Sequence, residues 1–136
     1  MEPFVWPVRV YYEDTDSGGV VYYANYLKFL ERARTEWLRG RGFEQDQLAR
    51  DRHLLFAVRR LSVEYRQPAR FNDQLEVVSQ VATAGGASLT FEQAIRRAGS
   101  TVALCEARVK VACIHALTLQ PRRMPQDLLR EMIGHA

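Results

Sequence analysis

The second part of the chain alternates between apolar and polar residues in several separate stretches. The alternation covers residues 75–83, 89–95 and 103–113, and also the later part of 54–66, which begins as a continuous apolar run. A period of two places the apolar side chains on one face of a β-strand. Short segments with glycine, proline or asparagine separate the stretches. The pattern therefore predicts long strands joined by short turns, with sequence neighbours paired antiparallel.

A different spacing marks the stretch that begins near Asn25. Apolar residues recur every three or four positions from Tyr23 to Trp37, which is the period of an amphipathic helix with one buried stripe. Asparagine is a favoured N-cap residue, so Asn25 is the predicted start; its alternative role is to orient the loop before it. Gly40 and Gly42 are expected to end the helix.

Three shorter elements complete the prediction. The β-rich run 8–12 is expected to be a first strand, residues 43–52 a short second helix, and the segment after Pro125 a last helix. The resulting order is strand, long helix, then several strands, which defines the α+β class. The economical packing is a long antiparallel sheet around one central helix. Its edge strand could be covered by a second copy of the chain.

Composition predicts one ordinary globular domain spanning residues 1–136, with 47% hydrophobic and 26% charged residues. No apolar run approaches the roughly 20 residues of a membrane span. The N-terminus lacks the basic-then-apolar layout of a signal peptide, so we expect a cytoplasmic protein without a transmembrane segment. Cys105 and Cys113 are expected to be reduced thiols in the core.

The residue types that commonly bind metals or cofactors form no recognisable motif in this sequence. His53, His115 and His135 are scattered and neither cysteine has a near partner, so no metal site is predicted. The net charge of +3 suits either solubility or an anionic ligand that carries phosphate. Because no basic run is interleaved with stacking aromatic residues, we do not expect a nucleic-acid partner.

The best candidate for chemistry is the segment just before the long helix. Asp14 and Asp16 follow the first predicted strand, and Gly18-Gly19 permit a turn. The start of a helix has free N–H groups and a partial positive charge. A carboxylate and these donors could together act on one carbonyl group. The alternative is that Asp16 only satisfies backbone N–H groups in the turn.

Two longer stretches carry a resemblance to a known family. VYYEDTDSGGVVYYANYLKFLERARTEWLR (Val10–Arg39) and RRLSVEYRQPARFNDQLEV (Arg59–Val77) resemble the hotdog-fold acyl-CoA thioesterases. The likeness is strongest to the Tol-Pal-associated thioesterases of Gram-negative bacteria, relatives of the 4-hydroxybenzoyl-CoA thioesterases. It covers nearly the whole chain and implies the hotdog fold, in which a long antiparallel sheet wraps around one central α-helix.

The resemblance also implies roles for residues. Asp16 matches the family's catalytic aspartate, as nucleophile or general base, and the polarising backbone N–H at the start of the helix falls at Tyr23. Asp14 and Asn25 are expected to support them. Many members of this branch have a histidine where this chain has Tyr23; the backbone N–H survives that change but an imidazole role does not.

The implied partners follow from the same likeness. The substrate is expected to be an acyl-CoA, with an acyl carrier protein as a further candidate, no cofactor, and a homodimer or homotetramer as the assembly. The phosphates of CoA require basic residues near the pocket. The candidates are Arg59, Arg60, Arg66, Arg70, Lys110, Arg122 and Arg123, and we choose Arg122 and Arg123 because they lie in a Pro-bounded segment after the last strand. One alternative is a non-catalytic acyl-CoA or acyl-carrier-protein binding module on the same fold. A hotdog hydratase is disfavoured because no paired Asp and His of that kind is present.

Overall fold

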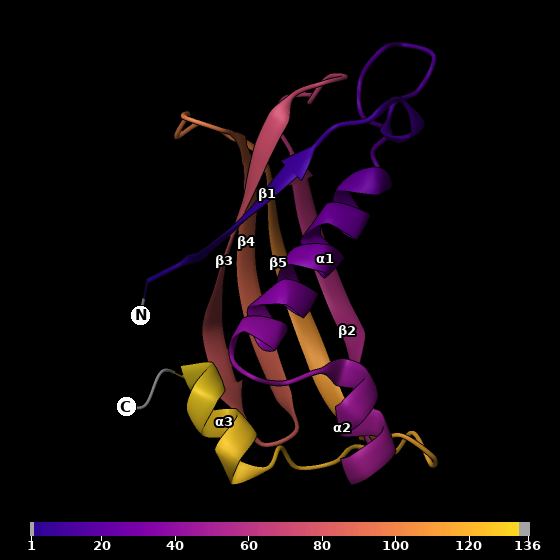
Figure 1. Cartoon of the computed structure of the whole chain (residues 1–136), viewed down its shortest axis with the longest axis vertical. Coiled ribbons are helices and arrows are strands. Elements are labelled where there is room, and N and C mark those ends of the chain that lie inside the picture. The colour runs from indigo at the N-terminus through magenta and orange to yellow at the C-terminus, as the bar shows by residue number, and fades with distance from the viewer. Residues whose placement is uncertain (1, 134–136) are drawn as a thin grey trace.

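One antiparallel sheet forms the body of the protein in the computed structural model, which describes residues 2–133. Its strands stand in the order β1-β3-β4-β5-β2 (Figure 1). The bounds are β1 Phe4–Arg9, β2 Leu54–Tyr65, β3 Gln74–Gly85, β4 Ser88–Arg97 and β5 Ala103–His115. The strands that the alternation predicts are therefore confirmed.

The helices lie on one face of this sheet and at one of its ends. The long helix α1 (Asn25–Gly40) runs along the inner face, while α2 (Gln45–Arg52) and α3 (Gln126–Ile133) lie at the lower end in Figure 1. A single 3-10 turn, Tyr12–Asp14, precedes the loop at the upper end. This arrangement is α+β, with one helix against a curved sheet.

The first strand lies earlier than predicted, because it covers residues 4–9 and not 8–12. Pro7 is inside β1, paired with Glu76. An edge strand tolerates proline because the missing N–H need not face a neighbour. The strand stops before the predicted end because the Asp14 carboxylate accepts a hydrogen bond from the Tyr11 N–H at 2.9 Å, which turns the chain.

The predicted pairing of neighbours holds for β3–β4 and β4–β5 but not for β2–β3. Strand β2 pairs with β5 at the far edge, and β1 occupies the free side of β3. The reason lies in the connecting segment 66–73, which is tied to α1 instead of forming a tight turn. The Val21 N–H donates to the Ala69 carbonyl, and the Ala69 N–H donates to the Tyr26 hydroxyl.

The core lies between α1 and the sheet. The helix buries a stripe that includes Phe29, Leu30, Ala33 and Trp37, so the predicted amphipathic pattern is confirmed. The indole ring of Trp37 is 1% exposed and meets the ring of Phe91 edge-on at 5.1 Å between centroids.

The state of the two cysteines and the length of the helices can also be compared with the predictions from sequence. Cys105 and Cys113 are buried and form no disulfide. Within residues 2–133, no helix combines the length and the apolar character needed to cross a membrane.

Candidate active site

A small hairpin carries the predicted acidic residues to the start of α1. Thr15 and Val21 form an antiparallel bridge, and the Asp16 N–H donates to the Val20 carbonyl at 2.9 Å. Gly19 closes the turn with φ of 79°, in the left-handed region that favours glycine. The hairpin therefore folds Asp16 back beside the residues that lead into the helix.

The Asp16 side chain is oriented by this turn and remains exposed in the single chain. Its Oδ1 atom accepts a hydrogen bond from the Gly18 N–H at 2.8 Å. A Cβ atom at Gly18 would lie 3.2 Å from that oxygen, so glycine leaves the contact room. Among residues 2–133, no group donates a hydrogen bond to the other oxygen, Oδ2. The turn thus fixes the carboxylate and leaves one oxygen available.

Asp14 and Asn25 hold the hairpin against the helix. The Asp14 carbonyl accepts hydrogen bonds from the Asn25 side-chain amide and from the Tyr22 N–H, both at 2.9 Å. The prediction that Asn25 is the N-cap is wrong: Asn25 is the first residue of α1 and Ala24 is the N-cap, with its own backbone in the helical region (φ −68°, ψ −21°). The Asn25 side chain therefore points back to the loop, which is its alternative predicted role.

The backbone at the start of α1 offers two free donors. The N–H groups of residues 25–27 are bonded to carbonyl groups three residues earlier. In the part of the chain that the structure describes, the N–H groups of Tyr23 and Ala24 have no acceptor. Unpaired N–H groups at a helix N-terminus, with the positive end of the helix dipole, can stabilise negative charge on an oxygen atom.

A hollow of about 250 Å³ opens beside these donors, between the start of α1 and the end of β2. Its lining includes Val21, Tyr23, Tyr26, Tyr65 and Arg66. The Tyr65 hydroxyl donates to the Tyr23 carbonyl at 3.2 Å and joins the two elements. Burial raises the pKa of the Tyr26 and Tyr65 phenols, so both stay neutral and act only through hydrogen bonds.

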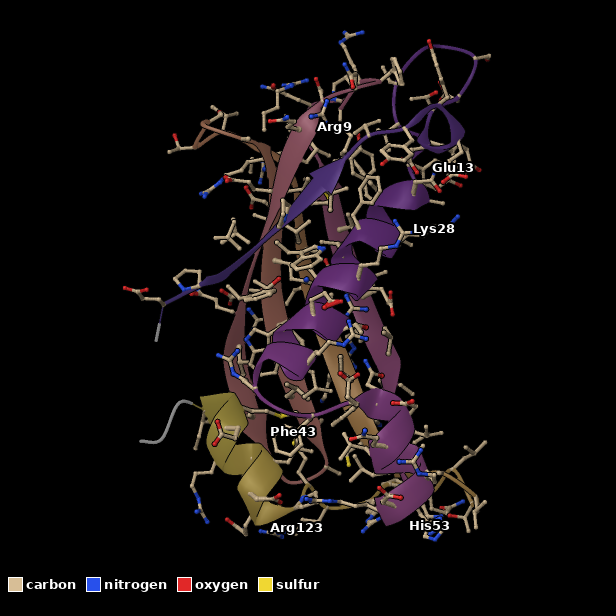
Figure 2. The ribbon with its side chains drawn as sticks, in the orientation of Figure 1. Arg9, Glu13, Lys28, Phe43, His53 and Arg123 are labelled. Carbon is tan, nitrogen blue, oxygen red and sulfur yellow. The ribbon has the colours of Figure 1, made fainter. Side chains whose placement is uncertain are left out.

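The predicted CoA-binding arginines lie away from this site within one chain. Arg122 donates to the His53 carbonyl at 3.2 Å and so caps the end of α2. Figure 2 shows Arg123 and His53 at the opposite end of the molecule from Glu13.

Two other arginines do lie near the hollow. Arg66 lines it, and Arg70 forms a bridge with Val20 in the hairpin. Both were candidates from sequence that could not be ranked there. Tyr65 is a residue that sequence analysis missed, although it stands at the end of the alternating face of β2.

The described residues contain no group of three or more His, Cys, Asp and Glu side chains that could hold a metal ion.

A curved antiparallel sheet around one long helix is the arrangement of the hotdog fold, and comparisons with known proteins agree. The model of the thioesterase-like superfamily matches residues 10–132. The chain therefore belongs to this superfamily.

Individual relatives support the same assignment. The chain is 49% identical over 128 residues to the acyl-CoA thioester hydrolase YbgC of Escherichia coli O6:H1, which covers 94% of each chain. A probable thioesterase from Bartonella henselae is 36% identical with a TM-score of 0.85, covering 90% of this chain and 99% of that one. A 1,4-dihydroxy-2-naphthoyl-CoA thioesterase from Synechocystis, 23% identical, shares the fold with a TM-score of 0.89, covering 97% and 96% of the two chains.

Proposed function

We propose that the protein is an acyl-CoA thioesterase, which hydrolyses a thioester to a free carboxylic acid and CoA. One observation carries the proposal: the hairpin that orients the Asp16 carboxylate leads directly into a helix start where, among the described residues, the Tyr23 and Ala24 N–H groups have no acceptor. The names of the YbgC relatives support the same substrate class.

In the proposed reaction, the thioester carbonyl oxygen accepts hydrogen bonds from the free N–H groups of the helix start. The Asp16 carboxylate either attacks the carbonyl carbon, giving a mixed anhydride and releasing the CoA thiolate, or removes a proton from a water molecule that attacks instead. Water then hydrolyses the anhydride in the first route. In both routes, negative charge grows on the carbonyl oxygen and the backbone donors stabilise it. A thiolate leaves readily, so a general acid is dispensable.

We further propose a homodimer formed through β2. This strand is at the edge of the sheet, and its apolar side chains Val58, Leu61 and Tyr65 are 51%, 40% and 45% exposed. An unpaired edge of this length is rare in a monomer because it would bind other strands. Two-fold pairing of β2 with its copy would remove the edge.

The dimer would also bring the predicted basic residues to the site. Antiparallel pairing along the whole of β2 places Leu54 of the partner subunit opposite Tyr65. The α2 end of the partner then lies near the hollow, and that end contains Arg122 and Arg123. In this arrangement these side chains bind the phosphates of CoA from across the interface, beside Arg66. A tetramer would be a pair of such dimers.

The oligomeric state gives a direct test. We expect a dimer or a larger assembly by light scattering coupled to size-exclusion chromatography. Leu61→Glu should dissociate it, because two like charges would face each other close to the two-fold axis. Val5→Glu, at a residue 42% exposed on the opposite edge strand, is the matched control and should leave the assembly intact. A monomeric wild-type protein would overturn the dimer.

Thiol release from acyl-CoA substrates tests the function itself. The assay should cover acyl groups of graded length, a benzoyl-type group and one acyl group on acyl carrier protein. We expect hydrolysis of at least one acyl-CoA series. Tight CoA binding without hydrolysis of any substrate would favour the non-catalytic binding module. A Tol-Pal association is proposed on the family resemblance alone, and a cytoplasmic location is proposed on the two buried cysteines, which form no disulfide.

A further inference from the structure

The two peptide groups that carry the free N–H groups of the helix start are not held equally well by the helix itself. In the peptide between Tyr22 and Tyr23, the Tyr22 carbonyl accepts the Asn25 N–H at 2.8 Å. In the next peptide, the Tyr23 carbonyl accepts the Tyr26 N–H at 3.4 Å, which is longer than the usual range of about 2.7–3.2 Å. The local turn therefore fixes the peptide with the Tyr23 N–H and holds the peptide with the Ala24 N–H more weakly.

A side chain from β2 adds a second hydrogen bond to this weaker peptide. The Tyr65 hydroxyl donates to the Tyr23 carbonyl at 3.2 Å. That carbonyl and the Ala24 N–H belong to one peptide group, and in a planar trans peptide the C=O and the N–H point in opposite directions. The bond from Tyr65 therefore also fixes the direction of the Ala24 N–H, which has no acceptor among the described residues.

Tyr65 is itself held by the sheet and by its aromatic neighbours. It is the last residue of β2, and directly after it the N–H groups of residues 66 and 67 both donate to the Leu104 carbonyl, at 2.8 and 3.1 Å. Its ring lies 5.5 Å from the ring of Tyr26 and meets Tyr23 edge-on at 6.2 Å, measured between centroids. A side chain supported in this way on a strand places its hydroxyl more precisely than a loop residue would.

The hydrogen bond from Tyr65 also changes how well the amide donates. Burial raises the pKa of the Tyr65 phenol, so the hydroxyl keeps its proton. A carbonyl that accepts a hydrogen bond polarises its amide, and such polarisation strengthens the next bond in a chain by about 10–30%. The Ala24 N–H should therefore be a better donor when Tyr65 is bonded to the Tyr23 carbonyl.

We infer that Tyr65 is a positioning residue, which aligns the Ala24 N–H as a second donor to the thioester carbonyl oxygen beside the Tyr23 N–H. The inference rests on the proposed function, because it needs the thioester carbonyl at the start of α1. Negative charge grows on that oxygen only as the carbonyl carbon is attacked, so a donor aligned in advance acts mainly in the transition state. Tyr65 does not touch the substrate and exchanges no proton with it.

Tyr65→Phe tests the contact, because it removes the hydroxyl and keeps the ring that packs against Tyr26. We expect kcat for the best acyl-CoA to fall about 5- to 30-fold, a part of the roughly 10²- to 10³-fold loss that follows removal of a whole donor. KM should change by less than about twofold, since the bond acts in the transition state. Thiol release measures both constants.

The matched control is Tyr11→Phe. The Tyr11 side chain is 61% exposed, lies before the hairpin and does not line the hollow. It should therefore keep the wild-type kcat and KM. A wild-type kcat in Tyr65→Phe, or a loss confined to KM, would overturn the inference.

A change to one backbone atom tests the donor itself. Lactic acid in place of Ala24, incorporated as the hydroxy acid by nonsense suppression, turns the Tyr23–Ala24 amide into an ester and deletes this N–H. The helix should still form, because the N–H is bonded to no acceptor in residues 2–133. We expect kcat to fall about 10²- to 10³-fold. Adding Tyr65→Phe to the ester protein should then lower kcat by less than a further twofold or so, because the group that Tyr65 aligns is gone.

The outcomes separate this inference from the proposed function. An ester protein with the wild-type kcat would show that the Ala24 N–H is not a donor to the substrate. A full additional loss from Tyr65→Phe in the ester protein would show that Tyr65 acts through another group. Either result would overturn the inference and leave the thioesterase proposal standing, because the wild-type protein would still hydrolyse acyl-CoA. An absence of hydrolysis by the wild-type protein with every acyl-CoA would contradict the function itself.

Discussion

Asp16→Asn is expected to lower kcat by about 10²- to 10⁴-fold, the range for the loss of a general base or a comparable group. The amide keeps the shape of the side chain, and its oxygen can still accept the hydrogen bond from the Gly18 N–H. The turn should therefore stay intact while the negative charge of the side chain is lost. Stopped-assay thiol release with the best acyl-CoA substrate measures the change.

A matched variant shows whether the loss is specific to this position. Asp51→Asn removes an exposed carboxylate whose only ion-pair partner among residues 2–133 is its neighbour Arg50 on α2, and we expect it to keep full activity. Both variants should unfold at the same denaturant concentration as the wild-type protein. Hydrolysis by Asp16→Asn at the wild-type rate would show that this carboxylate does no chemistry.

The second large effect is expected on stability. Trp37→Ala should lower the free energy of unfolding by about 3–5 kcal/mol, the usual cost of deleting a buried large aromatic side chain. Trp37 fills the space between α1 and β4, where it contacts Phe91, and the Arg41 guanidinium lies 4.0 Å from the ring centroid. The cavity left by alanine would border a cavity of about 130 Å³ beside α1, which Trp37 already lines. Urea unfolding followed by circular dichroism measures the change.

The other tryptophan provides the comparison. Trp6 is only partly buried in β1 and stacks on Phe4 with 6.3 Å between ring centroids. Trp6→Ala removes the same side chain from a more exposed place, so the free energy of unfolding should fall by clearly less than in Trp37→Ala. Equal losses for both variants would mean that the contact of α1 with β4 is not the main support of the fold.

The elements with a strong period could be predicted from the sequence alone. Strands β3, β4 and β5 alternate over their length, and α1 carries a clear apolar stripe, because each faces the core on one side only. The first strand was misplaced because Pro7 resembles a strand breaker unless the strand is known to be at an edge. The place of β2 was missed because the contacts of the segment 66–73 with α1 join residues far apart in the chain.

The candidate site could be predicted only in part, because some of its residues are neighbours in the sequence and others are far apart. The loop of Asp14 and Asp16 and the helix start are neighbours in sequence, so local pattern and family resemblance could bring them together. Tyr65 reaches the site from a strand some forty residues later in the chain. Asn25 was assigned as the N-cap from its residue type, whereas the first helical turn already forms at Ala24.

The link between the hairpin and the segment 66–73 limits how this protein can change during evolution. Ala69 is fully buried, accepts the Val21 N–H through its carbonyl and donates its own N–H to Tyr26. An insertion near Ala69 would shift the acidic turn relative to the helix, because these two hydrogen bonds fix the position of both. An insertion at the turn between β3 and β4 would leave the acidic turn in place, because the described residues of that turn make no hydrogen bond to the hairpin. The length of the segment 66–73 therefore sets the position of the acidic turn relative to α1.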